Sequence, residues 1–220
     1  MKKIIIIGGK GTAVVIAEQM IDSVVRFNVD LEVLGFAFDD ESFGDEINGL
    51  PILSKTKEVY NKFKDRSDVY FAYSLYRSDK IDERIKLRKS YGIPNERYIN
   101  FIHPLATVSR SVEMGVGNII LSGTVLNSNV KLGHFNTFHS GVHVGHDTNI
   151  QNSNFFAAQA VIGSNLIIGN GNFFGLNSSA KNFVEVGDYN IIGMAANVIK
   201  SVGSKEVLIG NPAKVLRKNE

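Results

Sequence analysis

Apolar residues recur every six positions from Val108 to Val198, and no insertion breaks the count. Of the 16 residues on this period, 15 are large and apolar, and the remaining one is Ala180. The residue that follows is glycine in eight of the 16 steps. An α-helix would repeat apolar residues at 3.6 positions and an alternating strand at 2, so neither accounts for a period of six. A hexapeptide repeat that coils into a parallel β-helix does, and we predict that fold for this region.

Three hexapeptides complete one triangular coil, so equivalent positions return every 18 residues. One column at this interval is asparagine throughout, at Asn118, Asn136, Asn154, Asn172 and Asn190. A second column is apolar and includes three phenylalanines, at Ile120, Phe138, Phe156, Phe174 and Ile192. Asparagine tolerates the left-handed backbone of a turn and hydrogen-bonds its neighbours, and stacked phenylalanines bury a large apolar area. We therefore expect both columns to be scaffold, and we look for chemistry outside them.

The region before His103-Pro104 lacks this period and alternates short apolar runs with amphipathic segments. Residues 3–7 are an apolar, β-branched run typical of a buried strand, and residues 12–27 have helical spacing. Further strands are expected at 31–38, 68–73 and 97–102, further helices at 55–63 and 79–91, and a loop at 44–53. This order predicts a small Rossmann-like α/β domain with a parallel sheet, followed by a left-handed parallel β-helix. The predicted domains are residues 1–104 and 105–220.

The composition of the whole chain excludes several classes of function. It has 24 basic and 22 acidic residues, so a formal net charge of +2 gives no support to nucleic acid or an acidic membrane surface as partner, and we expect neither. The absence of cysteine excludes disulfides, thiolate metal ligands and a cysteine nucleophile. The apolar run Ile4–Ile7 is too short for a signal peptide, and no later run approaches a membrane span. We therefore expect a soluble, cytoplasmic protein.

A glycine turn, Gly8-Gly9-Lys10-Gly11, follows the first expected strand. Gly9 and Gly11 would let the backbone approach an anion, and the N–H groups at the start of the next helix would point toward it. The turn lacks the third glycine of the dinucleotide-binding fingerprint, so an ordinary strand-to-helix turn explains it equally well. Asp39-Asp40, at the end of the second strand, has a similar pair of interpretations. It either contacts a ribose or base, or belongs to a solvated loop.

Four of the five histidines lie within 13 residues, at His134, His139, His143 and His146. A shared metal ion is one interpretation, because hexapeptide folds include three-histidine zinc sites. The period, however, places His134, His139 and His146 on three different sides of one coil. One ion would then need ligands from neighbouring subunits, and we expect no metal site.

The hexapeptide Val144–Asn149 contains the pair His146-Asp147. His146 is third in the hexapeptide, on the outer surface of the coil, whereas Val144 is expected inside. An exposed imidazole ionises near neutral pH and can accept a proton from an attacking amine or hydroxyl. Asp147 can hold the tautomer of His146, as the third member of a catalytic triad does. On these residues alone, a solvated surface histidine explains the pair equally well.

The motifs together resemble those of a known family. From His103-Pro104 through the hexapeptides, and with the N-terminal region, the chain is similar to hexapeptide acyltransferases such as sialic acid O-acetyltransferases and bacillosamine-type nucleotide-sugar N-acetyltransferases. The resemblance covers essentially the full length. The general base of that family is a histidine followed by an acidic residue, and here this pattern is Val144-Gly145-His146-Asp147. The family's terminal Gly-x-Pro-Ala-Lys matches Gly210-Asn211-Pro212-Ala213-Lys214.

The resemblance implies a homotrimer that binds acetyl-CoA in the groove between adjacent β-helices. It implies that the N-terminal domain holds part of a nucleotide sugar, through Gly8, Gly9, Gly11, Asp39 and Asp40. It implies that the pantetheine arm of CoA passes Gly163, Ser164, Leu176 and Met194, and that the CoA phosphates meet Lys200 or Lys214.

The chain departs from the family pattern at positions on the substrate side. The glycine turn reads Lys10-Gly11-Thr12-Ala13 where the family often has Ser-Gly-His-Gly, and Tyr73-Ser74 replaces Gly-Asn after the third strand. Nine residues past His146, Phe155 stands where the family has a second histidine, and we expect it on the path of the cofactor. Seven residues before His146, His139 replaces an asparagine that contacts the sugar in the family. We therefore expect His139 to contact the substrate.

The resulting hypothesis is an acetyl-CoA-dependent N-acetyltransferase that modifies a nucleotide-linked deoxy-amino sugar for surface-glycan synthesis, as in lipopolysaccharide or capsule. His146 would deprotonate the amine, Asp147 would orient His146, and the backbone N–H of Ser164 would stabilise the oxyanion. O-acetylation of a sugar hydroxyl needs the same base, so the sequence leaves it open. A non-catalytic scaffold that binds a nucleotide sugar, and a metalloenzyme similar to γ-carbonic anhydrase, are the alternatives from other classes.

Overall fold

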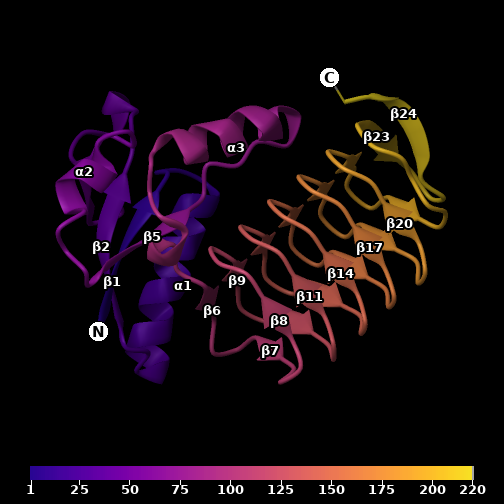
Figure 1. Cartoon of the computed structure of the whole chain (residues 1–220), viewed down its shortest axis with the longest axis horizontal. Coiled ribbons are helices and arrows are strands. Elements are labelled where there is room, and N and C mark those ends of the chain that lie inside the picture. Colours follow the sequence, from indigo (N-terminus) through magenta and orange to yellow (C-terminus); the bar gives the residue numbers. More distant parts are fainter. Residues whose placement is uncertain (220) are drawn as a thin grey trace.

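The structure, a computed structural model, describes residues 1–219 and consists of two units packed against each other (Figure 1). The N-terminal unit is an α/β domain, and the second unit is a triangular prism wound from short strands. The N-terminus lies in the first unit, and the chain ends at the far end of the prism (Figure 1). No helix within residues 1–219 has the length and apolar character needed to cross a membrane.

A five-stranded sheet forms the centre of the N-terminal domain, in the strand order β3-β4-β2-β1-β5. Its strands are β1 (Lys2–Ile7), β2 (Leu31–Ala37), β3 (Glu46–Ile47), β4 (Leu50–Ser54) and β5 (Val69–Tyr73), and all pair in parallel except β3. The helices are α1 (Thr12–Phe27), α2 (Val59–Phe63) and α3 (Ile81–Ser90), with 3₁₀ turns at Glu41–Phe43, Ser78–Lys80 and Asn95–Arg97. The four isoleucines of β1 are fully buried because this central strand is covered on both faces. The predicted first strand and first helix are confirmed.

Two predictions for this domain are wrong. The expected loop at 44–53 contains β3 and most of β4, which form a hairpin through Asn48-Gly49. Both turn residues have positive φ, 49° and 77°, so this Asn-Gly pair makes the turn of a hairpin rather than ending regular structure. The expected strand at 97–102 is reduced to a single bridge between Tyr98 and Phe71 of β5, followed by β6 (Phe101–Ile102), which pairs with the prism. Ile102 lies six residues before Val108 and therefore belongs to the hexapeptide period.

The prism is the predicted left-handed parallel β-helix, and each of its coils contains three strands of two residues. After β6, the strands are β7 (Thr107–Val108), β8 (Glu113–Met114), β9 (Ile119–Ile120), β10 (Val125–Leu126), β11 (Lys131–Leu132), β12 (Thr137–Phe138), β13 (His143–Val144), β14 (Asn149–Ile150), β15 (Phe155–Phe156), β16 (Val161–Ile162), β17 (Ile167–Ile168), β18 (Phe173–Phe174), β19 (Ser179–Ala180), β20 (Glu185–Val186), β21 (Ile191–Ile192) and β22 (Asn197–Val198). The antiparallel pair β23 (Glu206–Ile209) and β24 (Lys214–Lys218) closes the C-terminal end.

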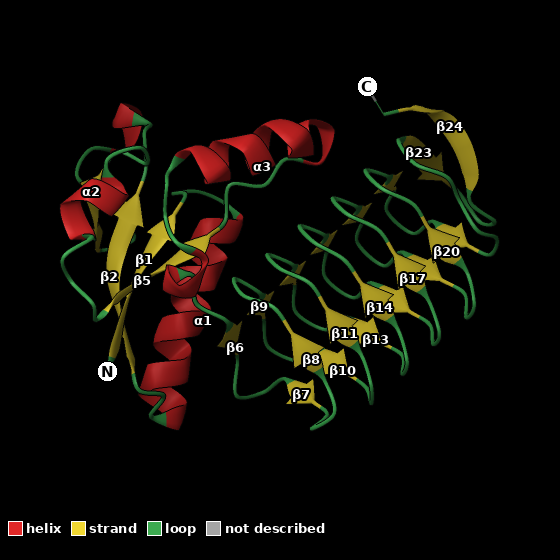
Figure 2. Cartoon of the chain, viewed as in Figure 1, coloured by secondary structure: helices red, strands yellow, loops and turns green. Residues whose placement is uncertain are grey.

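The strands stack into three sheets, which are the three faces of the prism (Figure 2). The docked face consists of β6, β9, β12, β15, β18 and β21, and it carries the N-terminal domain. The neutral face consists of β7, β10, β13, β16, β19 and β22, and the outward residues of these strands include no Asp, Glu, Lys or Arg. The charged face consists of β8, β11, β14, β17 and β20, and its outward residues include Glu113, Lys131 and Glu185. The turns between strands form three corners, each named here for the two faces that it joins.

The apolar period forms the core of the prism. The second residue of every strand from β9 to β22 points inward and is buried, whereas Val108 and Met114 at the open end are half-buried. The rings of Phe138, Phe156 and Phe174 stack at centroid distances of 4.7 and 4.9 Å. The six-residue period and the phenylalanine column are thus confirmed as scaffold.

The asparagine column runs along the charged–docked corner and is buried throughout. In each coil, the Oδ1 of one asparagine accepts the backbone N–H of the next, over 2.8–3.0 Å between Asn118 and Asn190. A buried backbone N–H without a partner would be costly, so this column satisfies the turn of each coil. The prediction that the column is structural is confirmed.

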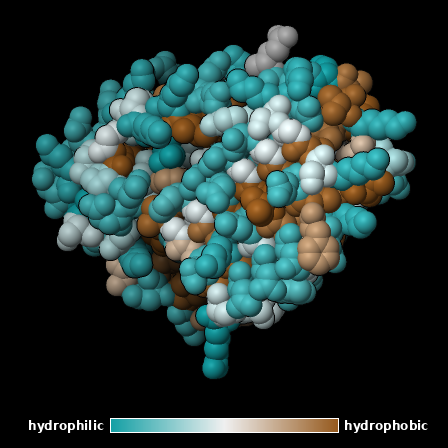
Figure 3. All heavy atoms as spheres, turned by 45° about the vertical axis from the view of Figure 1, so that its right-hand side comes forward, coloured by the Kyte–Doolittle hydropathy of each residue, from teal (hydrophilic) through white to brown (hydrophobic). Residues whose placement is uncertain are grey.

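The N-terminal domain packs on the docked face through α1, α3 and the segment after β5 (Figure 2). Three outward residues of this face, Phe101, Ile119 and Phe155, are therefore buried, and the other three, Thr137, Phe173 and Ile191, are half-buried. Apolar side chains also lie on the uncovered surface of the molecule (Figure 3). On the prism corners they include Leu176, Phe183 and Met194, each at least half exposed.

Replacement of the central ring of the stack, Phe156→Ala, is expected to lower the free energy of unfolding by about 3–5 kcal/mol, because it leaves a cavity between two buried rings. The matched control is Phe183→Ala, which removes a ring that is 73% exposed and is expected to change stability by less than about 0.5 kcal/mol. Urea denaturation monitored by circular dichroism measures both. Equal losses for the two variants would contradict a role of the stack in stability.

Candidate active site

His146 and Asp147 occupy the turn between β13 and β14, at the neutral–charged corner. His146 Nδ1 lies 2.6 Å from Asp147 Oδ2, and the side chains are 57% and 46% exposed. Asp147 has a φ of 57°, a left-handed conformation that aspartate adopts more readily than most residues. A Cβ at the preceding residue, Gly145, would lie 2.5 Å from the carbonyl carbon of Gly163, so the close stacking of coils requires glycine there.

A second hydrogen bond fixes Asp147. Asn129, one coil earlier, donates from Nδ2 to Asp147 Oδ1 over 2.9 Å. The hydrogen bonds from His146 and then from Asn129 lower the pKa of the Asp147 carboxyl below its ordinary value. An ionised Asp147 accepts the Nδ1–H of His146, which leaves Nε2 as the proton acceptor. This is the arrangement that a general base requires.

The glycine turn joins β1 to α1 at the carboxyl edge of the sheet. Gly8 and Gly11 have φ angles of 133° and 56°, and a Cβ on Gly9 would lie 2.3 Å from the ring of Phe38. Gly11 is the N-cap of α1, without a side-chain cap, and the first turn of the helix contains no acid. A helix N-terminus of this kind favours an anion, in agreement with the phosphate interpretation of the turn.

Asp39 and Asp40 both organise the loops beside the glycine turn. Asp39 accepts the backbone N–H and the hydroxyl of Thr56 at 2.8 and 2.6 Å. Asp40 accepts hydrogen bonds from Ser42, which lower the pKa of its carboxyl, and pairs with Lys10 over 3.6 Å. The two carboxylates are therefore engaged within the chain, and their contact with a nucleotide stays a prediction.

His139 follows β12 at the docked–neutral corner and faces the N-terminal domain. Its Nε2 lies 3.3 Å from the hydroxyl of Thr12, the first residue of α1. Its ring is 5.2 Å from that of Phe155, and burial lowers the pKa of the imidazole, which favours the neutral form. Thr12 directly follows the glycine turn and lies 127 residues before His139 in the sequence, so the fold brings the turn and this histidine together.

Phe155 is covered by Tyr76, which the sequence analysis did not single out. The two rings stack at 4.5 Å, and Tyr76 also lies 6.0 Å from the ring of Phe173. The cavity left between the domains here, beside Thr12 and Arg84, has a volume of about 30 Å³, which holds no more than one or two waters. Phe155 can therefore meet a cofactor only if Tyr76 moves.

The other residues expected on the CoA path lie in two places. Gly163 and Ser164 are at the neutral–charged corner, one coil beyond His146, and Lys200 follows at the same corner. Lys200 and Lys214 line one groove of about 430 Å³ at the C-terminal end of the prism. Leu176 and Met194, by contrast, are exposed on the docked–neutral corner.

The prediction that the backbone N–H of Ser164 stabilises the oxyanion is wrong for a single chain. The backbone N–H of Ser164 donates to Asn182 Oδ1 over 3.0 Å. This bond repeats the coil-to-coil pattern seen elsewhere at the corners, and it leaves that N–H without capacity for an oxyanion.

Within a single chain, the predicted site residues form two groups separated by the neutral face. His146, Asp147, Gly163, Ser164 and Lys200 belong to the neutral–charged corner. His139 and the glycine turn belong to the docked–neutral corner. The three histidines considered for a metal, His134, His139 and His146, lie at three different corners, as the period predicted.

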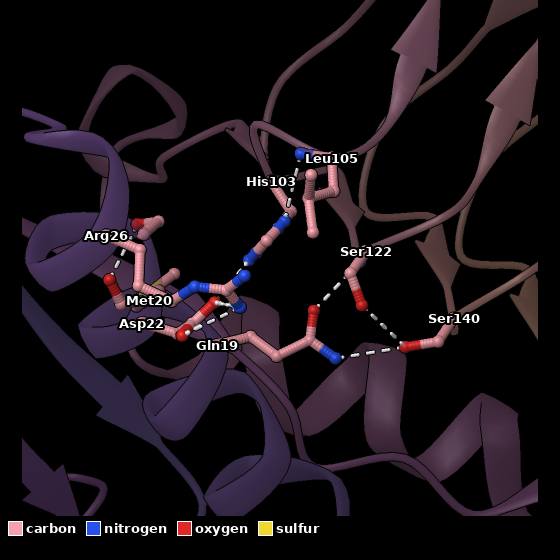
Figure 4. A network of polar contacts seen from close by, with 9 residues as sticks. Gln19, Met20, Asp22, Arg26, His103, Leu105, Ser122 and Ser140 are labelled. Carbon is pink, nitrogen blue, oxygen red and sulfur yellow. Dashed lines mark hydrogen bonds and ion pairs between the residues drawn. The ribbon is translucent and has the colours of Figure 1, made fainter.

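A polar network holds α1 against the docked–neutral corner (Figure 4). The Gln19 side chain accepts the backbone N–H of Ser122 at 2.8 Å and donates to Ser140 Oγ at 3.0 Å. Asp22 approaches Nε2 of the buried His103 at 3.4 Å, and the Nδ1 of that ring accepts the N–H of Leu105. These contacts set the position of the glycine turn relative to His139.

Three residues near these sites had no assigned role in the sequence analysis: Asn129, Tyr76 and Arg88. Asn129 lies 18 residues before Asp147, so the 18-residue interval that revealed the asparagine column could have found it. Tyr76 and Arg88 belong to the N-terminal domain, whose sequence has no such interval, and only their docking on the prism reveals them.

Because burial lowers its pKa, His139 is expected to titrate below the ordinary value of about 6.5 in a proton NMR titration. The unfolded chain then binds more protons between the two pKa values, so His139 makes stability rise with pH in that window. The variant His139→Gln identifies the imidazole resonance of His139 by its disappearance, and it removes the contribution of this residue to the pH dependence of stability. Thr12→Val is the control, because it removes the hydroxyl but keeps the burial, and the pKa should stay low. A midpoint at or above about 6.5 in the unmodified chain would contradict the assignment.

Solved structures with the same fold cover the whole chain. A mutant of perosamine N-acetyltransferase from Caulobacter crescentus, in complex with CoA and GDP-perosamine, has a TM-score of 0.82 at 22% identity, over 99% of this chain and 98% of that one. The acetyltransferase domain of PglB from Neisseria gonorrhoeae, in complex with acetyl coenzyme A, has a TM-score of 0.83 at 21% identity, over 98% and 99%. WeeI from Acinetobacter baumannii has a TM-score of 0.78 at 24% identity, over 98% and 100%. No family model and no curated protein sequence matches the chain. At these identities the likeness establishes the fold, a Rossmann-like α/β domain followed by a left-handed parallel β-helix.

Proposed function

We propose that this protein is an acetyl-CoA-dependent N-acetyltransferase that acts on a nucleotide-linked amino sugar, in the cytoplasm, for surface-glycan synthesis. The observation that carries the proposal is the His146–Asp147 pair, with its 2.6 Å hydrogen bond on an exposed corner of the prism. The similar structures support it, since one is a perosamine N-acetyltransferase with CoA and GDP-perosamine and another holds acetyl coenzyme A.

In this proposal, Nε2 of His146 takes the proton of the attacking amine, and Asp147 stabilises the imidazolium that results. The low pKa of Asp147 keeps its carboxylate ionised, so that it holds the Nδ1–H through the reaction. Acetyl-CoA supplies the activated acyl group as a thioester. Proton transfer of this kind contributes about 10²–10⁴-fold to the rate.

Two copies of the chain are needed to complete the site. The base and the predicted nucleotide turn lie at the two edges of the neutral face, so they meet when the neutral–charged corner of one copy approaches the docked–neutral corner of the next. The neutral face suits an interface because its outward residues carry no full charge that would lose its hydration on burial. They are Thr107, Val125, His143, Val161, Ser179 and Asn197. Repetition of this contact around an axis gives a closed ring, which we propose is the homotrimer.

The groove between two such copies would hold acetyl-CoA. On one side it presents Gly163, Ser164 and the exposed Phe183, and on the other side Leu176 and Met194, which are 50% and 71% exposed. Apolar walls of this kind fit a pantetheine arm. The ammonium groups of Lys200 and Lys214, which share one groove, fit the phosphates at its end.

His146→Ala is expected to lower kcat for acetyl transfer at least about a hundredfold, because it removes the base. His146→Gln should lose as much, since it keeps a polar side chain without a basic nitrogen. Thiol release with a panel of nucleotide-linked amino sugars measures the rate, and sedimentation checks that the assembly persists. A loss of less than tenfold would overturn the role of His146. Mass spectrometry of products from paired amino and hydroxy sugars separates N- from O-acetylation.

A site shared between copies predicts complementation between two inactive variants. His146→Ala removes the base, and Gly11→Asp places a negative charge in the predicted phosphate turn, where a Cβ meets no atom within 4 Å. The φ of 56° and ψ of −118° at Gly11 strain an aspartate and an asparagine side chain alike. Mixed, refolded trimers should recover about a quarter of the activity, because some sites then combine an intact base with an intact turn from the neighbour. Gly11→Asn is the uncharged control for Gly11→Asp. No recovery would place the whole site within one chain.

A further inference from the structure

A second groove lies between the C-terminal half of α3 and the charged–docked corner, away from the neutral face. Its volume is about 360 Å³, and its walls include Arg88, Lys89, His134 and Tyr189. This size falls within the range of small-molecule sites, and it exceeds the space that a single phosphate ion needs. The proposed homotrimer leaves this groove open, because the copies meet on another face.

The groove carries positive charge without an internal counter-charge. Its lining contains two cations and no Asp or Glu. Within residues 1–219, the Arg88 and Lys89 side chains make no ion pair, and the polar neighbour of Arg88 is the hydroxyl of Tyr98, which is not an acid. Arg88 is half-buried, and burial lowers the pKa of its guanidinium. A partly desolvated guanidinium normally has an acidic partner, and an oxyanion bound in this groove would supply that counter-charge to Arg88.

The position of the Arg88 side chain is better explained by ligand binding than by the dipole of α3. Cations in the last turn of a helix interact favourably with its dipole, which explains the sign of the charge at Arg88 and Lys89. The dipole does not require the guanidinium carbon to lie over the ring of Phe135, 3.4 Å from its centroid. This contact restrains the guanidinium group, whose N–H groups can then form paired hydrogen bonds to an oxyanion.

His134 adds a neutral donor on the opposite wall. Its Nδ1 accepts the backbone N–H of Val116 at 3.0 Å, so the proton of the neutral ring is on Nε2. The amides of Asn152 and Asn170 are occupied in a coil-to-coil ladder of hydrogen bonds. The groups that face the groove therefore include three donors, namely a guanidinium, an ammonium and an imidazole N–H, and no carboxylate in the lining competes with a ligand for them.

We propose that this groove binds the phosphate group of a small phosphorylated molecule, with Arg88 and Lys89 as the charges and Nε2–H of His134 as a third donor. Two cations match the double charge of a phosphate monoester better than the single charge of a carboxylate. The remaining volume accommodates the organic part of the ester. Such a ligand contacts both α3 and the prism, and so it ties the N-terminal domain to the β-helix at a point separate from the proposed transfer site.

The test is direct binding to the full-length chain by calorimetry, with inorganic phosphate and glucose 1-phosphate as probes and glucose as the uncharged control. We expect one saturable site per chain, and tighter binding of glucose 1-phosphate than of phosphate if the ester is the ligand. Arg88→Gln should weaken binding at least about tenfold, because it removes a charge-assisted pair of hydrogen bonds. Lys89→Gln, at an exposed position whose loss leaves the fold intact, should weaken it several-fold.

The matched control is Lys86→Gln, which removes the same charge from an exposed position of α3 that does not line the groove. This variant and His146→Ala should bind phosphate as the unmodified chain does. Failure of both probes to bind, or equal weakening by Lys86→Gln and Lys89→Gln, would overturn the proposal. A loss of phosphate binding that occurs only in Lys200→Gln or Gly11→Asp would also overturn it, because the phosphate would then lie in the CoA groove or at the glycine turn. No readout here depends on acetyl transfer, so failure of the proposed function would not be mistaken for failure of this site.

Discussion

The stacking of equivalent residues along the prism axis is the constraint on which the rest of the structure depends. Each strand has two residues, so one side chain per strand lies inside, and it must be apolar and fit its neighbours above and below. Rings stack in this way from Phe138 to Phe174, and the asparagine column satisfies the backbone of the turns. These two columns stabilise each coil against the next, and they leave exposed corner positions such as His146 and Asp147 available for chemistry.

The candidate chemistry uses the same coil-to-coil geometry as the scaffold. Asn129 holds Asp147 across one coil, just as Asn136 holds the backbone of Asn154. The difference is exposure, since Asp147 lies at an open corner and its ionised oxygen can orient His146. A rigid, repeating frame therefore positions an imidazole without a dedicated loop, which limits the reorganisation that proton transfer would need. The same regularity explains why the N–H of Ser164 is already occupied.

Docking of the N-terminal domain gives the three faces of the prism different roles. It covers the docked face, brings the glycine turn to His139 through Thr12, and leaves the neutral face uncovered. The polar contacts of Gln19 and Asp22 fix this placement on one corner. On the opposite corner, Arg88 stacks on Phe135 and borders a groove with no acid in its lining. The two corners of the docked face are thus suited to different ligands.

The amino-acid sequence is sufficient to predict the β-helix, its inward residues, its asparagine column and the corner on which His146 and Asp147 lie. A strict period is sufficient for this, because every contact in it joins residues at a constant separation. It also located the glycine turn and α1, whose signals are local. The Asn48-Gly49 hairpin also has a local signal, the Asn-Gly pair itself. Three features follow from the packing of the two domains: Tyr76 covers Phe155, His139 meets Thr12, and the two halves of the predicted site lie at different corners of one chain. These contacts join a domain without a period to one with a period, so no spacing in the sequence encodes them, and they depend on how the two surfaces fit.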